Sequence, residues 1–105
     1  MTYNITYKDK ARGSFIWDEA KEVSNIHMHG MDFTAASLAF YDPQCIIAID
    51  EPHSHEEERF FCIGKIMGRI ATVRFTYRGD KIRIIGAGYW RKGRKFYERK
   101  YATNS

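Results

Sequence analysis

Four arginines of this 105-residue chain have the chemistry to bind a phosphate group: Arg59, Arg74, Arg78 and Arg83. All four lie on or beside predicted strands, and a planar guanidinium can pair with two phosphate oxygens at once. Cleavage of RNA without a metal needs such a group, because negative charge grows on the phosphate in the transition state. Strict alternation cannot place all four on one face of a sheet. Each could instead be an arginine that forms an ion pair facing solvent.

Three side chains are candidates for proton transfer: His55, Glu58 and Tyr97. Histidine exchanges protons near neutral pH, and a glutamate or tyrosine can do so when its neighbours shift its pKa. For Tyr97 taken alone, packing in the core is the simpler interpretation.

The four histidines form two His-x-His pairs, at 27/29 and 53/55. Residues i and i+2 of a helix point about 200° apart, so His27 and His29 cannot ligate one metal. The loop pair could, and residues 53–64 nearly match the metal motif of the cupin barrels. However, each spacing is about one residue short, and the final histidine of that motif is missing. We therefore expect no metal site and no cofactor.

A polar stripe lies on the first predicted helix, where Lys21, Asn25 and His29 are spaced i, i+4, i+8. Two roles fit this stripe. It can fix the helix against the sheet, or it can line the edge of a substrate cleft.

Charge is divided unevenly along the chain, although the net charge is only +4. Residues 1–58 hold 4 Lys/Arg and 11 Asp/Glu, a net charge of −7, whereas residues 59–105 hold 13 and 2, a net charge of +11. A basic half of this density favours an anionic partner, either nucleic acid or an acidic protein segment. A solvated basic surface without a partner is the alternative.

The strongest basic segment, residues 91–101, can form a helix with Tyr97 and Tyr101 as its contact stripe and Phe96 beside them. Gly93 costs such a helix about 1 kcal/mol relative to alanine, and no good capping residue precedes it. We therefore expect a frayed helix or one stabilised by a partner. The predicted nucleic-acid contacts are the cations Arg78, Arg91, Lys92, Arg94 and Lys95.

Two helices are predicted between residues 15 and 43. Asp18 and Asp32 can cap their N-termini, Gly30 can end the first, and the Asp42-Pro43 step stops the second. Strands are predicted over residues 14–17, 45–49, 58–63, 69–77 and 81–87, with a polar loop at 50–57, a connection at 64–68 and a hairpin turn at 78–80. This order predicts one α+β domain of two layers, in which the N-terminal helices pack on an antiparallel sheet and a basic C-terminal helix follows.

The ends of the chain are expected to be peripheral. Residues 1–13 are predicted to be an extra strand or a loose arm, and residues 102–105 a disordered tail. No apolar run is long enough to span a bilayer, and no signal-peptide pattern opens the chain, so we expect a cytoplasmic protein.

An ordered set of short motifs covers residues 15–98. The first part reads Phe15-x-Trp17-Asp18-Glu19-x-Lys21, Asn25, His29-Gly30, Phe33, Ala36 and Asp42-Pro43. The second part reads Glu58-Arg59-Phe60, Gly64, the run from Phe75 to Asp80, the run from Ile82 to Ile85, and Arg94-x-x-Tyr97-Glu98. In this order the motifs resemble the BrnT toxins, small bacterial ribonucleases of toxin–antitoxin pairs.

The resemblance implies a RelE-like fold and a metal-independent endoribonuclease that inhibits translation and growth. It singles out Arg59 and Arg83 as phosphate-binding catalytic residues, with Tyr97 or Glu58 moving protons. The implied partners are an RNA substrate and a ribbon-helix-helix antitoxin of the BrnA type, which binds operator DNA itself.

The resemblance fails at one place. BrnT sequences typically read Ile-Ser-Ala-Arg after the last strand, whereas this chain has Gly86 and Gly88 where the serine and the arginine are expected. Loss of a charged transition-state donor can cost several kcal/mol. The departure favours an alternative to a full toxin, namely a catalytically weak or inactive module that binds RNA and antitoxin. A DNA-binding or acidic-partner protein unrelated to toxins is a third possibility.

Overall fold

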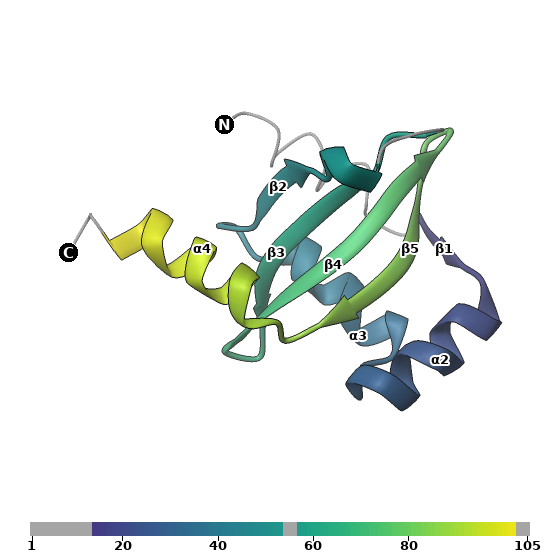
Figure 1. The fold of residues 1–105 in the computed structure, drawn as a ribbon, viewed down its shortest axis with the longest axis horizontal. Coiled ribbons are helices and arrows are strands. Elements are labelled where there is room, and N and C mark those ends of the chain that lie inside the picture. The colour runs from purple at the N-terminus through teal and green to yellow at the C-terminus, as the bar shows by residue number, and fades with distance from the viewer. Residues whose placement is uncertain (1–13, 54–56, 103–105) are drawn as a thin grey trace.

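The sheet is built around an antiparallel meander of four strands: β2 (Ile46–Ile49), β3 (Phe60–Ile66), β4 (Arg69–Arg78) and β5 (Lys81–Gly88) (Figure 1). The computed structural model describes residues 14–53 and 57–102. β1 (Phe15–Trp17) joins β5 in parallel, giving the order β1-β5-β4-β3-β2. The predicted α+β fold is confirmed, but the sheet is mixed rather than wholly antiparallel. Helices, not a hairpin, connect β1 to the meander, so its direction is not constrained to be antiparallel.

The predicted helix signals are confirmed. The Asp18 carboxylate accepts hydrogen bonds from the amides of Ala20 and Lys21 at the start of α2 (Glu19–His29), which ends at Gly30 with a φ of 71°. The Asp32 carboxylate accepts from the Ala35 amide at the start of α3 (Phe33–Ser37). A 3₁₀ turn, η1 (Leu38–Tyr41), completes that helix before Asp42.

The largest difference from the predicted strand boundaries lies at one connection, and β3 also begins at Phe60 instead of residue 58. Residues 64–66 continue β3 instead of forming a loop, and the turn is confined to Met67 and Gly68, both with positive φ. Gly64 serves the packing rather than the turn, because a side chain there would collide with the Ala39 carbonyl in η1. A short 3₁₀ turn, η2 (Glu51–His53), also lies in the predicted loop.

Several predictions fall outside the described residues: the arm at 1–13, His55 and the tail at 103–105. Ala102, which was expected in the tail, is instead the last residue of the C-terminal helix, α4 (Arg91–Ala102).

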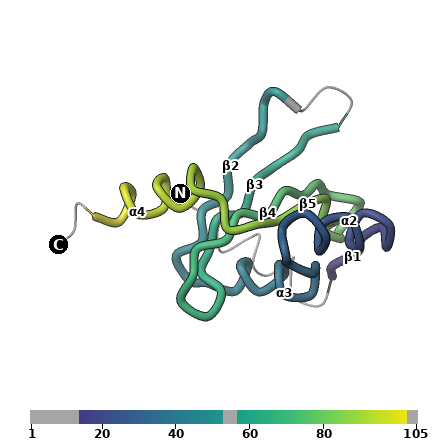
Figure 2. The backbone as a smooth tube through the Cα atoms, turned by 60° about the horizontal axis from the view of Figure 1, so that its bottom comes forward, coloured from purple at the N-terminus to yellow at the C-terminus, as the bar shows by residue number. Residues whose placement is uncertain are grey.

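The two faces of the sheet are covered differently. One face carries the main core, in which Phe33 and Phe40 of the helices pack on Val73, Phe75 and other buried strand residues. The opposite face carries a small cluster of Ile46, Ile63 and Tyr97 beneath α4. Helix α4 lies at one end of the molecule and α2 at the other (Figures 1 and 2), so α4 covers only part of this second face. We call the part of this face that α4 does not cover the open face.

Helix α4 has more support from its own chain than the sequence suggested. Gly93 was expected only to weaken it, but a side chain there would collide with the Thr72 hydroxyl, so the glycine allows the helix to pack directly on β4. Tyr97 is 3% exposed, its ring lies 5.1 Å from that of Tyr101, and the Tyr101 hydroxyl donates to the Gln44 carbonyl. Phe96 does not join this stripe and is 43% exposed.

The Asp42 carboxylate joins α4 to the sheet. It accepts hydrogen bonds from the Lys65 amide at 2.8 Å and from the Tyr97 hydroxyl at 2.6 Å. Lys65 lies beyond the end of the β2–β3 pairing, so the carboxylate takes the place of the missing strand. Burial, together with the hydrogen bond to Asp42 and its negative charge, raises the pKa of Tyr97 well above the usual value of a tyrosine.

The Asn25 side chain has the same role at the other edge. Its amide accepts from the Ala87 N–H at 3.1 Å and donates to the carbonyls of Ala87 and Met31, both at 2.9 Å. β1 pairs only with residues 82–84 of β5, so Asn25 completes the edge where β1 has ended. Asn25 is the one buried residue of α2, and this contact sets where the helix lies.

We predict that Asn25→Asp lowers the free energy of unfolding by about 2–3 kcal/mol, because a carboxylate cannot donate to the two carbonyls it would face. The measurement is urea denaturation at pH 7. Ser24→Ala, at the exposed neighbouring position on α2, is the matched control and should leave the midpoint unchanged. Equal midpoints for Asn25→Asp and the wild type would contradict the role given to this side chain.

We predict that Tyr97→Phe costs about 1–2 kcal/mol at pH 8, through the loss of a hydrogen bond to a charged acceptor. The pKa of Tyr97 is higher in the folded protein than in the unfolded chain, where it is about 10. The hydrogen bond therefore contributes its full stabilisation below about pH 10, and this stabilisation is lost as the pH rises further, because the unfolded chain then ionises first. The difference between variant and wild type should therefore shrink above pH 10. A difference that stays constant from pH 8 to pH 11 in urea denaturation would refute this assignment.

Candidate functional site

A hollow of about 360 Å³ lies on the open face, between α2 and the strands. The sheet contributes Arg74 and Gly86, Arg59 directly precedes β3, and α2 contributes Lys21 and His29 across from them. Asn25, Ser24, Met28, Ile85 and Trp90 complete the lining. The predicted stripe of Lys21, Asn25 and His29 thus faces this hollow, with the buried Asn25 amide holding the helix and the two exposed side chains beside it.

Arg59 and Arg74 bring two guanidinium groups to the floor of the hollow. Arg74 pairs with Phe61 of β3 and with Gly86 of β5, next to a bulge at which Ile85 is the extra residue. Bulges re-aim side chains locally and recur beside functional sites. The side chains of Arg59 and Arg74 are 34% and 31% exposed, so both can reach a ligand.

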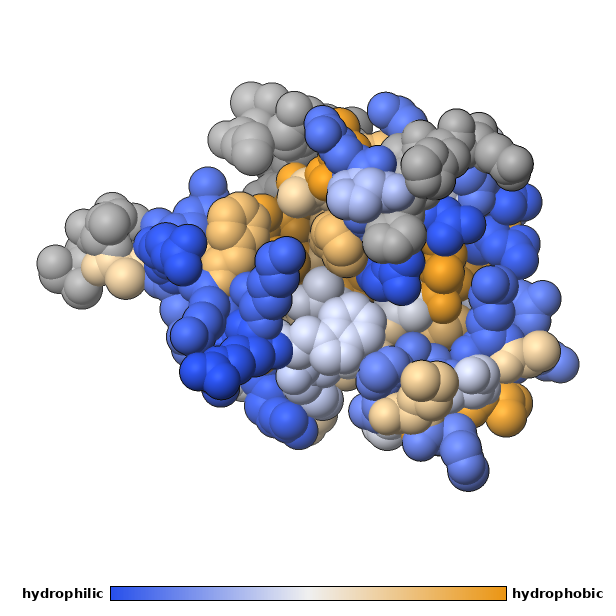
Figure 3. Space-filling view, in the orientation of Figure 1, coloured by the Kyte–Doolittle hydropathy of each residue, from blue (hydrophilic) through white to orange (hydrophobic). Residues whose placement is uncertain are grey.

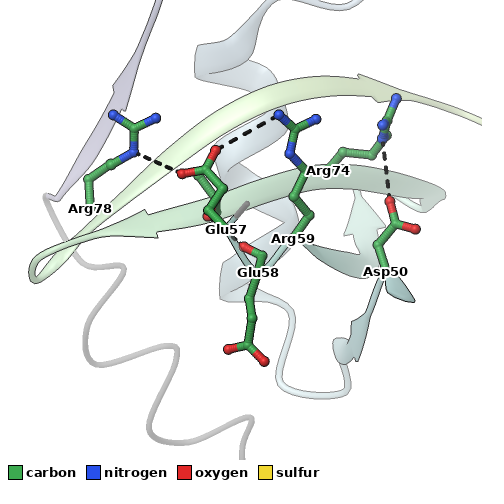
Figure 4. Close-up of polar contacts among 7 residues, drawn as sticks. Asp50, Glu57, Glu58, Arg59, Arg74 and Arg78 are labelled. Carbon is green, nitrogen blue, oxygen red and sulfur yellow. Dashed lines mark hydrogen bonds and ion pairs between the residues drawn. The ribbon is translucent and has the colours of Figure 1, made fainter. Parts of the chain in front are cut away.

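Two carboxylates orient these arginines (Figure 4). Glu57 lies 3.8 Å from Arg59 and 3.4 Å from Arg78, and Asp50, itself buried, lies 4.0 Å from Arg74. These ion pairs restrict where the guanidinium groups of Arg59 and Arg74 can lie. Glu57 and Asp50 were not among the predicted site residues, because their positions in a polar loop gave no periodic signal.

Arg83 lies on the same open face as Arg59 and Arg74, although alternation was not expected to bring the predicted arginines to one face, and it lies outside the hollow. Thr76 is its partner in β4, and the Thr76 hydroxyl donates to the Glu58 carbonyl at 2.6 Å. One residue of β4 therefore separates Arg83 from the start of β3. Two strand spacings, about 10 Å, separate its backbone from that of Arg59.

The predicted proton carriers Glu58 and Tyr97 are not brought to the hollow. The Glu58 side chain is exposed and points away from Arg59 (Figure 4). Tyr97 is buried under α4, where its hydroxyl donates to Asp42. Its raised pKa keeps the phenol protonated at neutral pH. His55 lies outside the described residues.

The two glycines that depart from the BrnT pattern differ in their surroundings. A side chain at Gly86 would make only an ordinary contact with Asn25, 3.5 Å away. A Cβ at Gly88 would lie 2.6 Å from Trp90 Nε1, because the indole ring lies against the glycine. The same ring contacts His29 edge-on, with 5.2 Å between ring centroids. Trp90 therefore fills the space beside the position where the family's arginine is expected, which no sequence pattern indicated.

The predicted RNA-contacting cations of α4 are exposed, namely Arg91, Lys92, Arg94 and Lys95. In Figure 3 the surface of α4 is largely blue, and it lies at the opposite end of this view from α2. Arg78 is likewise exposed at the end of β4, beside Glu57. The cations thus flank the hollow on two sides instead of forming one cluster.

Among residues 14–53 and 57–102, no group of three or more His, Cys, Asp or Glu side chains is placed so that it could hold a metal ion. No helix in the described part of the chain is long and apolar enough to cross a membrane.

Comparison with known protein families matches residues 17–93 to the family described as the ribonuclease toxin BrnT of type II toxin–antitoxin systems. A comparison with curated proteins finds no match. The family match spans most of the chain and includes α2, the four strands β2 to β5 and the residues that line the hollow. The chain therefore belongs to the BrnT family of ribonuclease toxins of type II toxin–antitoxin systems.

Proposed function

We propose that the hollow on the open face is the active site of a metal-independent endoribonuclease. The observation that carries the proposal is the pair Arg59 and Arg74, partly exposed on the floor of the hollow and facing Lys21 and His29 of α2. Guanidinium groups can stabilise the negative charge of a phosphorane without a metal ion. Arg83 and Arg78, further along the same edge of the site, would contact the neighbouring phosphates of the strand.

In the proposed reaction, the ribose 2′-oxygen attacks phosphorus and the bond from phosphorus to the 5′-oxygen breaks. Glu57 accepts the proton from the 2′-hydroxyl, and His29 donates a proton to the leaving 5′-oxygen. The products are a 2′,3′-cyclic phosphate and a 5′-hydroxyl. An in-line displacement places the attacking and leaving oxygens on opposite sides of phosphorus. Glu57, near the start of β3, and His29, beside Trp90, lie toward opposite ends of the arginine pair.

These assignments replace Glu58 and Tyr97 as proton carriers. Glu58 points away from the arginines, and Tyr97 donates its hydroxyl to Asp42 beneath α4. We assign Tyr97 to the attachment of α4, and Asn25 to the placement of α2, from which Lys21 and His29 extend.

A non-cleaving module that binds RNA and antitoxin is the second candidate. The packing of Trp90 against Gly88 favours it, since the arginine expected there is absent and its space is filled. Membership of a type II system implies an antitoxin as partner. We propose that this antitoxin is a ribbon-helix-helix protein of the BrnA type, through which alone the toxin would be held at operator DNA.

We predict that Arg59→Lys lowers kcat for RNA cleavage about 100-fold, because lysine cannot replace a bidentate guanidinium. Arg99→Lys, in the exposed last turn of α4, is the matched control and should cleave like the wild type. Both assays are run with excess EDTA, which should not change the rates. Loss of wild-type cleavage in EDTA would overturn metal independence. Absence of cleavage at every condition, with RNA binding retained, would favour the non-cleaving module.

We predict that His29→Asn lowers kcat by about 100-fold or more, as expected for loss of a general acid. A substrate with a 5′-phosphorothiolate at the scissile bond separates this role from a structural one. Sulfur leaves without protonation, so this substrate should restore the rate of the variant to near that of the wild type. Equal impairment on both substrates would exclude His29 as the acid.

A further inference from the structure

A second hollow, of about 520 Å³, lies on the same side of the sheet beneath the first turns of α4. Its floor is formed by Ala48, Phe61, Ile63 and Thr72 of β2–β4, and its rim by Trp90, Lys92, Gly93 and Phe96. Lys92 is the single charged residue of this lining. We call it the aromatic groove, after Phe61, Trp90 and Phe96.

The aromatic groove and the arginine-lined hollow are neighbours. Trp90 lines both. Phe61 of the groove and Arg74 of the hollow are directly paired across β3 and β4, and cross-strand partners on one face have Cβ atoms about 5 Å apart. Figure 3 shows the corresponding surface, where a pale and orange strip runs between the blue side chains of α4 and those around α2.

The arginine-lined hollow and the aromatic groove suit the phosphate and the base of one nucleotide, respectively. Single-stranded nucleic acid binds where cations contact the phosphates and aromatic side chains stack on the unpaired bases. Here a phosphate held by Arg74 would leave its base next to Phe61 and Trp90, within the groove. The exposed Phe96, at the rim, offers a further ring surface, and Lys92 can contact the adjoining backbone.

The position of Trp90 is set by its surroundings. Its ring lies against Gly88 on one side and contacts the His29 ring edge-on. A ring held in place loses little side-chain entropy when a base stacks on it. The glycine at position 88 therefore has a consequence beyond the loss of an arginine, since it makes room for a stacking side chain between the two hollows.

We infer that the aromatic groove is a nucleobase-binding subsite, in which Phe61, Trp90 and Phe96 stack on the unpaired bases flanking the phosphate bound in the hollow. The inference rests on the proposed function for the identity of that phosphate as part of an RNA strand. It adds a source of affinity that depends on bases and not on charge.

The test compares two octamers with equal numbers of phosphates: 2′-O-methyl oligoadenylate, and the same chain with abasic riboses. Neither can be cleaved at a 2′-hydroxyl. We expect the base-containing octamer to bind about tenfold or more tightly, the scale of one or two stacked bases. Phe96→Ala should reduce this ratio at least fivefold while leaving abasic binding unchanged. Tyr41→Ala is the matched control, because Tyr41 is also 43% exposed but lies on η1, outside the groove.

Fluorescence gives a second readout. The chain has two tryptophans, so in a Trp17→Phe background the emission reports on Trp90 alone. Oligoadenylate should quench it, and the abasic octamer should not. Equal affinities for the two octamers, or unchanged Trp90 emission on oligoadenylate binding, would overturn the inference.

The outcome is separable from that of the proposed function. Base-dependent binding by a protein that cleaves no RNA would support the groove and refute the ribonuclease proposal. Cleavage of RNA without base-dependent binding would support the ribonuclease proposal and refute the nucleobase subsite. Loss of antitoxin binding in Phe96→Ala, with the octamer ratio unchanged, would assign the groove to a protein partner and overturn the nucleobase subsite.

Discussion

The arrangement of this domain depends on one constraint: the backbone groups of a buried strand must have hydrogen-bond partners even where the neighbouring strand has ended. β5 extends beyond β1, and β3 extends beyond β2. Asn25 completes the first edge and Asp42 the second, each with hydrogen bonds shorter than 3.2 Å. These two polar side chains place α2 and α4 at opposite ends of the sheet, and the open face is the region left between them.

The positions of α2 and α4 determine the shape of the proposed active site. α2 buries only Asn25, and its exposed Lys21 and His29 lie across from Arg59 and Arg74. α4 makes close contact with β4 only because Gly93 has no side chain, and its first turns form the rim of the aromatic groove. Glu57 and Asp50 compensate the positive charge of these arginines and form ion pairs with Arg59 and Arg74.

Glycine in place of the expected arginine at position 88 affects both the binding of phosphate by charge and the binding of bases by aromatic stacking. An arginine there would offer charge to a phosphate, whereas Gly88 leaves space that the Trp90 indole occupies, beside His29. Charge complementarity is lost at this point and an aromatic surface is gained. Within a BrnT toxin, such an exchange would shift binding energy from the backbone of the RNA toward its bases.

The sequence by itself determined the local structure, because caps, glycines and alternation act over a few residues: Asp18, Gly30 and Asp32 set the helices, and the strands of the meander follow their apolar patterns. It also determined the family, through motifs whose order along the chain is informative without coordinates. The tertiary structure alone decided the parallel pairing of β1, the burial of Tyr97 against Asp42, and the contact of Trp90 with Gly88. The first two features join segments that are far apart in the sequence, and the third depends on how a ring packs. The periodicity of the sequence predicts neither. Arg59 and Arg74 share a floor because of strand register, and register is a property of the assembled sheet.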